Sequence, residues 1–435
     1  MTVALPTSRD VIEAQQLAAL RTLLSSLTTN PFYAPRLRAA ELDGSIDNLD
    51  DFTTRLGFTT KAELVEDQRI HPPYGTNLTF PLERYSRYNQ TSATTGTPMR
   101  WLDTTESWQA LLQVWRRVFD VAGVTRTDRI FFAFSFGPFL GFWTAFEAAT
   151  QLGALAIPGG GMSSAARLAA ILDNEATVLC CTPTYAIRLS EVAAQEGIDL
   201  SRSRVRRIIV AGEPGGSIPA IRDRIETVWP GARVVDHHGM TEVGPVSYEN
   251  PHHRGILHIV EEAFLPELID PTTLQPLDWK RAAEAREPIV GELVLTTLKR
   301  IGSPLLRYRT GDLVRISSRT AEELGTAEMA LEGGILGRAD DMVVVRGVNV
   351  YPSAIDQIIR SDGEVAEYRV EVTSKRGMTE LSIVVEAAGH CTDATGLCAR
   401  LEQALRRVLQ LRVPVRPGTD LPRFEMKARR WVRHP

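Results

Sequence analysis

Between residues 108 and 236, short strand-like runs alternate with amphipathic helical stretches, and this pattern limits the fold more than any other feature of the chain. Such alternation predicts a largely parallel sheet covered by helices. We expect strands at 129–135, 154–157, 178–181, 207–211 and 233–236, and helices at 108–122, 141–152, 163–173, 184–196 and 217–228. Because ligands of such sheets lie beyond the carboxyl ends of the strands, the residues after each strand are the first candidates for a site.

The regions on either side predict further units. Helices are expected over 12–27 and 59–70, and the chain becomes rich in strands after residue 255, most clearly at 291–297 and 313–317. The last hundred residues predict a hairpin around Glu332-Gly333-Gly334, helices at 352–360 and 394–410, strands at 367–374, 379–387 and 411–415, and an irregular tail over 416–435. The predicted fold class is α/β. A large N-terminal domain (1–337) has helix-flanked parallel-type sheets and a strand-rich subdomain, and a small mobile α+β C-terminal domain (338–435) follows.

Composition excludes several classes of protein. The 435 residues carry a net charge of -4, with no basic stripe of the kind that nucleic-acid binding requires. The four cysteines (180, 181, 391 and 398) form no CxxC pair or disulfide framework, and the first two belong to a buried strand pattern. The sequence shows no signal peptide and no apolar run long enough to span a bilayer, so we expect a cytoplasmic protein without membrane contacts.

A loop of small residues precedes the alternating region. It reads Gln90-Thr91-Ser92-Ala93-Thr94-Thr95-Gly96-Thr97-Pro98. Backbone N–H groups and hydroxyls in such a loop can approach phosphate oxygens. The Gly-Lys-Ser/Thr ending of a Walker A loop is absent. Taken alone, a Ser/Thr-rich surface loop is the simpler interpretation.

The segment Asp236-His237-His238-Gly239-Met240-Thr241-Glu242 directly follows a predicted strand. A glycine turn beside a threonine and a carboxylate suits a nucleotide with its magnesium ion. The adjacent histidines, with His252, His253 and His258 nearby, raise structural zinc as an alternative. Adjacent side chains usually diverge, and no cysteine lies among them, so zinc is the weaker hypothesis.

Three later segments place polar residues in turns or linkers. Tyr308-Arg309-Thr310-Gly311-Asp312 is typical of a turn, and its aspartate could also bind ribose hydroxyls. Gly337-Arg338-Ala339-Asp340-Asp341, followed by 346–352, is typical of a linker that leads into a helix, or of a hinge. Lys427 lies in a basic tail, where a lysine normally faces solvent.

In this order, the five segments resemble the motifs of the adenylate-forming (acyl/aryl-CoA synthetase) superfamily, and their spacing is most similar to that of phenylacetate–CoA ligase-like aryl-acid ligases. The likeness covers nearly the whole chain, including Asn30-Pro31-Phe32-Tyr33. It implies an ATP-dependent carboxylic-acid ligase that forms an acyl-AMP from an aromatic or arylacetic acid and then transfers the acyl group to CoA.

The resemblance also implies a role for each matching residue. Residues Thr91, Ser92, Thr94, Thr95, Gly96 and Thr97 would contact the β- and γ-phosphates of ATP, and Gly212, Glu213 and Pro214 would form the adenine turn. Adenine and the α-phosphate would be flanked by Asp236, His237, His238, Gly239 and Met240, with Thr241 at that phosphate and Glu242 on Mg²⁺. Asp312 and Arg338 would lie at the ribose, Asp340 at the hinge, and Lys427 would stabilise charge during adenylation. A rotated C-terminal domain would line the CoA channel with Gly347, Asn349 and Tyr351.

The acyl pocket is expected between the strand ends and the helix near residue 140. Its candidates are Phe134, Phe136, Phe139, Trp143 and Gly160, although aromatic residues at this spacing are equally typical of plain core. If they contact the substrate, a flat aryl or arylacetic acid is favoured over a long fatty acid.

The chain departs from the family pattern at three positions. Ala93 replaces a glycine of the phosphate loop, and Thr97 replaces its basic residue, which removes one cation from the pyrophosphate side. His238 lies where tyrosine is frequent, and its imidazole can still stack on adenine.

Alternatives remain open at this stage. The acceptor could be an amine or a carrier protein instead of CoA, because the adenylation motifs are common to all three. A nucleotide-binding protein that has lost catalysis is a further hypothesis, and a homodimer is one option for the assembly. Besides the acid, the expected ligands are ATP, Mg²⁺ and CoA.

Overall fold

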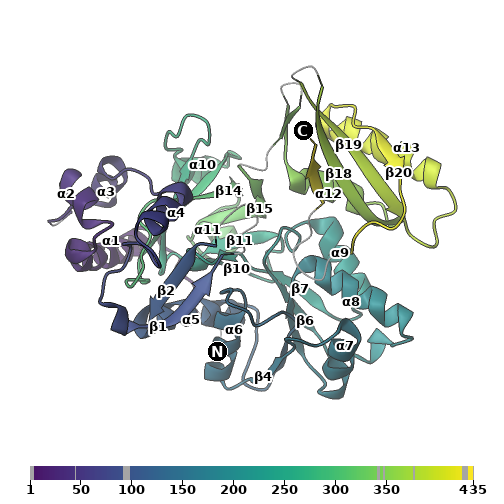
Figure 1. Ribbon diagram of the computed structural model, residues 1–435, viewed down its shortest axis with the longest axis horizontal. Helices are drawn as coiled ribbons and strands as arrows, with labels where there is room; N and C mark the ends of the chain where they lie inside the picture. Colours follow the sequence, from purple (N-terminus) through teal and green to yellow (C-terminus); the bar gives the residue numbers. More distant parts are fainter. Residues whose placement is uncertain are drawn as a thin grey trace.

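The computed structural model describes residues 4–44, 46–91, 98–339, 343–345, 348–375, 378–423 and 430–434. Its N-terminal part is a cluster of helices, at the left of Figure 1: α1 (Arg9–Ser26), η1 (Leu27–Thr29), α2 (Ala34–Ala39), α3 (Leu49–Arg55) and α4 (Lys61–Ile70). A capping box between Thr60 and Glu63 fixes where α4 begins, because each residue's side chain accepts a hydrogen bond from the other's backbone N–H. Lys61 is therefore the first residue of α4.

The alternating region folds into one parallel sheet, as the sequence predicts. The strand order is β4-β3-β5-β6-β7, and every neighbouring pair is parallel. The strands are β3 (Arg129–Phe132), β4 (Leu155–Pro158), β5 (Val178–Cys181), β6 (Arg207–Val210) and β7 (Arg233–Asp236). The connecting segments contain α6 (Trp143–Leu152), α7 (Ser164–Asp173), α8 (Pro183–Gln195), η3 (Leu200–Arg202) and α9 (Pro219–Val228). Cys180 and Cys181 are fully buried in β5, as expected.

The strand-rich subdomain is a six-stranded antiparallel sheet with the order β10-β11-β15-β14-β13-β12. Its strands are β10 (Ser247–Glu249), β11 (Ile256–Ile259), β12 (Phe264–Ile269), β13 (Val290–Thr297), β14 (Tyr308–Ile316) and β15 (Ala330–Arg338). The remaining elements of the N-terminal part are η2 (Leu82–Arg84), β1 (Tyr85–Gln90), β2 (Arg100–Thr104), α5 (Thr105–Val121), β8 (Gly239–Met240), β9 (Gly244–Pro245), α10 (Trp279–Ala285) and α11 (Ala321–Leu324). One hydrophobic core joins α1, α5, one face of the parallel sheet and the antiparallel sheet, so these units form a single body.

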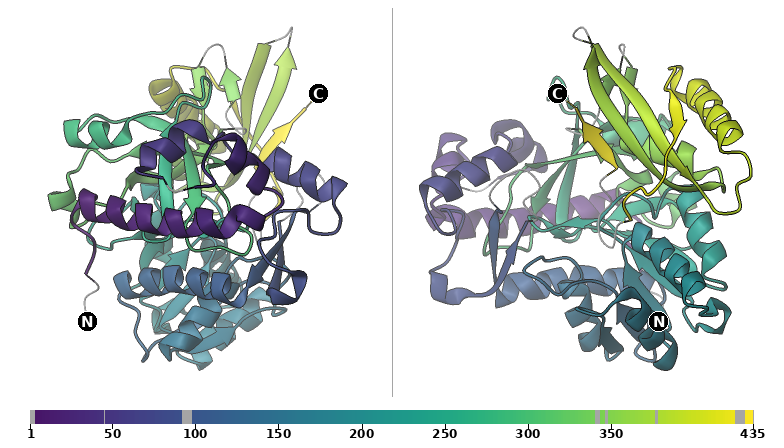
Figure 2. Two further views of the ribbon diagram at one scale, coloured as in Figure 1. Left: turned by 90° about the vertical axis from the view of Figure 1, so that its left-hand side faces the viewer. Right: turned by 45° about the vertical axis from the view of Figure 1, so that its right-hand side comes forward.

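The last part of the chain forms its own domain, at the upper right of Figure 1. It comprises β16 (Val343–Val345), β17 (Val348–Val350), α12 (Pro352–Arg360), β18 (Val365–Lys375), β19 (Met378–Ala387), α13 (Ala394–Leu409), β20 (Val415–Pro417) and β21 (Trp431–Arg433). Its main sheet has the order β20-β19-β18-β21 and stands above α8 and α9, as the right-hand view of Figure 2 shows. A separate core between this sheet, α12 and α13 makes it a distinct unit. Across the described parts of the chain, no helix is long and apolar enough to cross a lipid bilayer.

Three local predictions for the last hundred residues are wrong. Glu332-Gly333-Gly334 is no hairpin, because β15 runs through it, and the positive φ angles of Gly333 (81°) and Gly334 (65°) make a bulge against β14. The strand expected at 411–415 begins only at Val415, since Leu411 and Val413 pack into the domain core without joining the sheet. The tail is not wholly irregular, because β21 pairs in parallel with β18.

Candidate active site

Two of the predicted nucleotide segments follow neighbouring strands of the parallel sheet. The turn 211–214 follows β6, and 237–240 follows β7, with Val210 and Asp236 opposite each other in the ladder. The side chain of Glu213 accepts a hydrogen bond of 2.8 Å from Thr184 N, in the first turn of α8. The predicted adenine turn is therefore tied to a helix N-terminus at the edge of the sheet where ligands are expected.

Asp236 is buried and held from several sides. Ser217 Oγ donates to its Oδ2 at 2.6 Å, and His237 N donates to Oδ1 at 3.0 Å. A Cβ at Gly216 would lie 2.3 Å from Oδ1, so only glycine leaves room for this carboxyl. Burial raises the pKa of Asp236 above its usual range. The side chain of Asp236 therefore fixes the shape of the turn.

Asp312 forms a polar cluster with two other predicted nucleotide residues. Asp312 and Arg338 lie opposite each other on β14 and β15, and Arg338 Nη1 is 3.3 Å from Asp312 Oδ1. His238 Nε2 lies 3.0 Å from Asp312 Oδ2. Arg338 Nη1 also donates to Thr310 O at 2.8 Å. The antiparallel sheet thus contributes Asp312 and Arg338, and the segment after β7 contributes His238, to one group.

Glu242 and Thr241 lie in the turn between β8 and β9. The Glu242 carboxylate is buried and forms an ion pair with Lys61 Nζ, 2.9 Å away at the start of α4. The hydroxyl of Tyr308 donates a hydrogen bond to the same carboxylate. Burial, together with the negative charge of Glu242, holds the pKa of that hydroxyl well above its usual range, so it stays protonated. A cation and a neutral donor therefore orient Glu242.

Arg300 binds the backbone of the turn between β8 and β9. Its Nη1 donates to the carbonyl oxygens of Thr241 and Glu242, at 3.0 and 2.8 Å. Its Nε and Nη2 each lie 2.6 Å from an oxygen of Asp103, and both side chains are almost completely buried. Such a bidentate pair is geometrically specific, and it leaves the Thr241–Glu242 turn little freedom to move.

A cavity of about 390 Å³ opens beside these groups. Three cationic side chains line it, those of Lys61, Arg309 and Arg338, and Arg309 is paired with the buried carboxylate of Glu292 at 2.6 Å. Each of the three is paired with a carboxylate, so the cavity is lined by ion pairs whose N–H donors suit a polar ligand that brings its own counter-ion.

The residues present fit Mg²⁺ better than zinc. Mg²⁺ in nucleotide sites is held by one or two carboxylates together with substrate phosphates, and Glu242 supplies such a carboxylate beside the cavity. In the described parts of the chain, no group of three or more His, Cys, Asp or Glu side chains could hold a metal ion. His258 is a core residue, since its buried ring stacks on Tyr248 with centroids 5.3 Å apart.

Most of the acyl-pocket candidates come together near the carboxyl end of β3. The rings of Phe134 and Phe136 lie 4.3 Å apart, and Phe136 meets Trp143 edge-on at 4.7 Å. A Cβ at Gly160 would lie 2.9 Å from Phe136 Cδ2, so Gly160 borders the same cluster. Phe139 makes no ring contact with these residues in the described parts of the chain and lies beside Gly137 instead.

Several predicted site residues cannot be placed. Residues 92–97, Asp340, Gly347 and Lys427 lie outside the described residues, as does the side chain of Asn349. Thr91 is described, and its N–H and Oγ1 both bond to the backbone of Met99, which fixes the start of the predicted phosphate loop. Tyr351 is half-buried directly before α12.

Comparison with known proteins fits this geometry. Residues 88–294 match the family described as AMP-binding enzyme, and residues 347–434 match the AMP-binding enzyme C-terminal domain. The phenylacetate–coenzyme A ligase of Thermus thermophilus is 31% identical over 385 residues, which cover 87% of this chain and 82% of that protein. The chain belongs to the phenylacetate–CoA ligase family. As a member of this family it is an adenylate-forming, AMP-forming acid–thiol ligase.

Solved structures also bear on how the domains of this ligase are arranged. A 2-hydroxyisobutyryl-CoA ligase in its postadenylation state, in complex with R3-HIB-AMP, has a TM-score of 0.90 at 26% identity and covers 99% of this chain and 91% of that chain. In its thioesterification state that protein, with the same coverage and 27% identity, has a TM-score of only 0.72. The C-terminal domain here is therefore placed more nearly as in the postadenylation structure.

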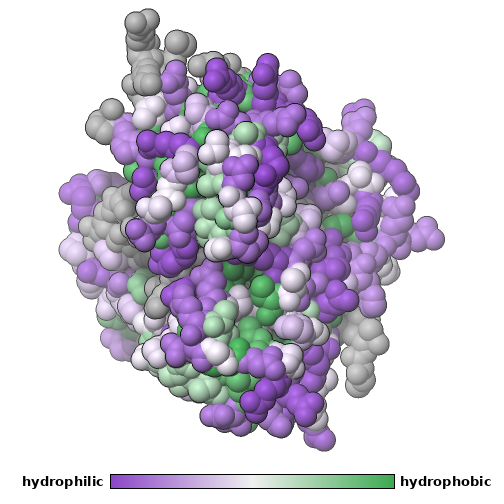
Figure 3. Space-filling view, turned by 90° about the vertical axis from the view of Figure 1, so that its right-hand side faces the viewer, coloured by the Kyte–Doolittle hydropathy of each residue, from purple (hydrophilic) through white to green (hydrophobic). Residues whose placement is uncertain are grey.

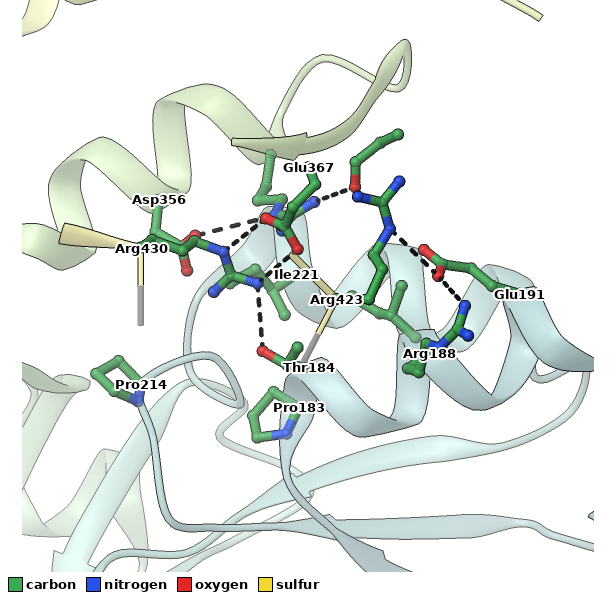
Figure 4. A pocket seen from close by; sticks show the side chains of 13 residues that line it. Pro183, Thr184, Arg188, Glu191, Pro214, Ile221, Asp356, Glu367, Arg423 and Arg430 are labelled. Carbon is green, nitrogen blue, oxygen red and sulfur yellow. Dashed lines mark hydrogen bonds and ion pairs between the residues drawn. The ribbon is translucent and has the colours of Figure 1, made fainter. Parts of the chain in front are cut away.

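The two domains of the ligase meet along a polar seam beside α8 and α9, which Figure 4 shows from close by. Arg430 Nη2 lies 3.5 Å from Thr184 Oγ1, and its Nε pairs with Glu367 within the C-terminal domain at 2.8 Å. Arg224 Nη1 donates to Val365 O at 3.0 Å. In the side view of Figure 3, hydrophilic residues cover most of the surface, and a cluster of hydrophobic residues lies in the lower middle. Since the backbone N–H of Thr184 also binds Glu213, the seam lies next to the predicted adenine turn.

Motif reasoning missed three residues that shape this site: Lys61, Arg300 and Tyr308. The capping signal at Thr60 predicted the helix that carries Lys61, and Tyr308 lay inside a motif noted for its aspartate. The link of each residue to Glu242 arises only when distant segments pack together, so no local pattern could reveal it.

Proposed function

We propose that the enzyme activates an aryl or arylacetic acid with ATP and passes the acyl group of the resulting acyl-adenylate to CoA. The curated relative above is a phenylacetate–CoA ligase. Phe134, Phe136 and Trp143 supply ring faces and edges at the ligand edge of the sheet, against which a flat aromatic acid can pack. Because ATP and CoA are intracellular substrates, we place the reaction in the cytoplasm.

In this proposal the polar cluster around Asp312 binds the nucleoside. The Asp312 carboxylate accepts hydrogen bonds from the ribose hydroxyls, and Arg338 and His238 keep that carboxylate oriented. The His238 ring and the residues 212–214 flank adenine, while Gly239 and Met240 lead the backbone to Thr241 at the α-phosphate. The observation that carries the proposal is that Arg338 of this cluster and Lys61 of the Glu242–Lys61 pair line one cavity, although they come from separate segments.

Attack of the acid on the α-phosphate brings two anions together, so the site must supply positive charge. Mg²⁺ held by Glu242 would offset the charge of the phosphates when it is bound. Lys61 adds a second cation at the same carboxylate. Tyr308 and Arg300 keep the carboxylate and its turn in place during the reaction.

Lys427 is proposed to supply charge at the bridging oxygens during adenylation. Arg430, the first described residue after Lys427, contacts Glu367 and Thr184 and so lies beside the residues 211–214. Rotation of the C-terminal domain would break the Arg430–Thr184 and Arg224–Val365 contacts. It would then place Gly347, Asn349 and Tyr351 along the path of the CoA thiol, with Asp340 as the hinge.

The test is pyrophosphate release from ATP and Mg²⁺ across a panel of benzoic, arylacetic, cinnamic and fatty acids, with and without CoA. The proposal expects release that depends on an aryl acid, and a CoA thioester that forms only when CoA is present. Release without a thioester would instead identify an amine or a carrier protein as acceptor. No release with any acid of the panel would contradict the proposal.

A further inference from the structure

His237 is a buried histidine at the carboxyl end of the parallel sheet. It directly follows β7, only 4% of its surface is exposed, and its ring lies 4.2 Å from that of Trp115 on α5. Its Nδ1 is 2.6 Å from the carbonyl oxygen of Ser247. Because a carbonyl oxygen can only accept a hydrogen bond, Nδ1 must carry the proton.

The other ring nitrogen is then a lone-pair acceptor. Burial lowers the pKa of His237 to about 3, so at neutral pH the ring holds a single proton, the one on Nδ1. No residue that the structure describes donates a hydrogen bond to Nε2. Some buried side-chain atoms of the described residues are both fully enclosed and unpartnered, and Nε2 does not belong to that group. Nε2 is therefore not completely enclosed, and among the described residues no donor uses its acceptor capacity.

A continuous row of rings connects His237 to the acyl-pocket candidates. Trp115 lies 5.8 Å from Phe142, and Phe142 lies 5.2 Å from Phe134, centroid to centroid. His237 thus contributes an acceptor at one end of a row of largely buried rings. The indole Nε1 of Trp115 is buried and has no partner within the described structure, so two atoms in this row have unused hydrogen-bonding capacity.

An acceptor among apolar rings distinguishes ligands that can donate a hydrogen bond to it from ligands that cannot. A ligand with a matching donor recovers the hydrogen bond that water would otherwise make, whereas an apolar ligand of the same size leaves Nε2 desolvated and unpaired. We infer that the acid activated by this enzyme carries a hydroxyl or amino group on its acyl part, and that His237 Nε2 accepts a hydrogen bond from that group. This inference rests on the proposed function and narrows its substrate class.

The experiment compares matched aryl and arylacetic acids that carry hydroxyl, amino, methoxy or methyl groups at the same ring position. For each acid, kcat/KM for pyrophosphate release is measured with the wild type and with His237→Phe, which keeps a ring against Trp115. At the best ring position, we expect the wild type to favour the hydroxyl or amino acid over its methyl analogue by about tenfold. In His237→Phe this ratio should fall to about one.

The ratio separates recognition from general damage, because both acids are measured on the same protein and a partial loss of folded enzyme cancels. His252→Leu, a change at an exposed histidine, is the control and should keep the wild-type ratio. Equal rates for donor and methyl acids in the wild type, or an unchanged preference in His237→Phe, would overturn this inference and leave the proposed function intact. No release with any acid would overturn both.

Discussion

At the residue scale, the Lys61–Glu242 pair is the contact that the site depends on most directly. Lys61→Met keeps the apolar stem and removes the charge. We expect pyrophosphate release to fall about a hundredfold, because one preorganised cation is lost where negative charge builds up. The free energy of unfolding should fall as well, because the buried Glu242 carboxylate loses its cation and keeps only the hydrogen bond from Tyr308.

Lys280→Met is the matched control, because Lys280 also pairs with a glutamate, Glu13, but far from the cavity. The control should retain full activity. Equal activities of Lys61→Met and Lys280→Met would show that Lys61 takes no part in the reaction.

At this scale, the sequence indicated a nucleotide-binding role only for residues that lie in short glycine-containing segments. Asp312, Arg338 and His238 were each predicted to lie at the nucleotide, and the structure brings all three together. Lys61 and Arg300 lie in no such segment, and only long-range packing gives them a role. Lys427 stays a prediction, because it lies outside the described residues.

At the scale of elements, the turn between β8 and β9 depends on Arg300. Arg300→Lys keeps the charge, but one ammonium cannot bind both oxygens of Asp103 and the carbonyls of Thr241 and Glu242 as well. We expect the free energy of unfolding to fall by about 2 kcal/mol, because a buried pair is weakened, and kcat to fall at least tenfold, because the turn loses its anchor. Urea unfolding and pyrophosphate release measure the two effects.

Arg307→Lys provides the comparison, because Arg307 is also buried and binds Glu267 with both Nε and Nη2. It should lose similar stability with little loss of activity. If Arg300→Lys is as active as Arg307→Lys, the anchoring role of Arg300 is refuted.

Element prediction succeeded where periodicity and capping agree. β5, β7 and α12 have the predicted bounds, since apolar runs or an early proline define them locally. Element prediction failed where the same residues are compatible with two different local structures. Gly333 and Gly334 suit a tight turn as well as a bulge, and pairing with β14 decides for the bulge. The short β21 has no pattern of its own and exists because β18 offers a free edge.

At the scale of the whole molecule, one buried network ties α1 to the antiparallel sheet. Arg9 binds both carboxylate oxygens of Glu261, and Glu328 receives hydrogen bonds from Tyr248 Oη and Glu261 N. Burial and, to a lesser degree, the charge of Glu261 raise the pKa of Glu328 to about 7. The folded protein therefore keeps this proton over a pH range in which the unfolded chain has lost it.

This proton makes stability depend on pH. Between the unfolded value of 4.5 and about 7 the folded state binds more protons, so the free energy of unfolding falls as pH rises through that window. Glu328→Gln cannot titrate. From pH 5 to pH 8 we expect the wild type to lose roughly 2–3 kcal/mol relative to this variant, measured by urea unfolding.

Glu322→Gln, at an exposed position nearby, should follow the wild type at both pH values. A constant difference between wild type and Glu328→Gln from pH 5 to pH 8 would mean that Glu328 is ionised throughout the window, and would contradict the assignment.

The central claim is that the acid attacks the α-phosphate of ATP, and isotope transfer tests it most directly. An aryl acid labelled with ¹⁸O in both carboxylate oxygens is converted with ATP, Mg²⁺ and CoA, and the AMP is analysed by mass spectrometry. Attack at the α-phosphate, followed by transfer of the acyl group to the thiol, leaves one ¹⁸O in each AMP formed, and this is the predicted result. AMP without label, or ADP with label in inorganic phosphate, would contradict the account.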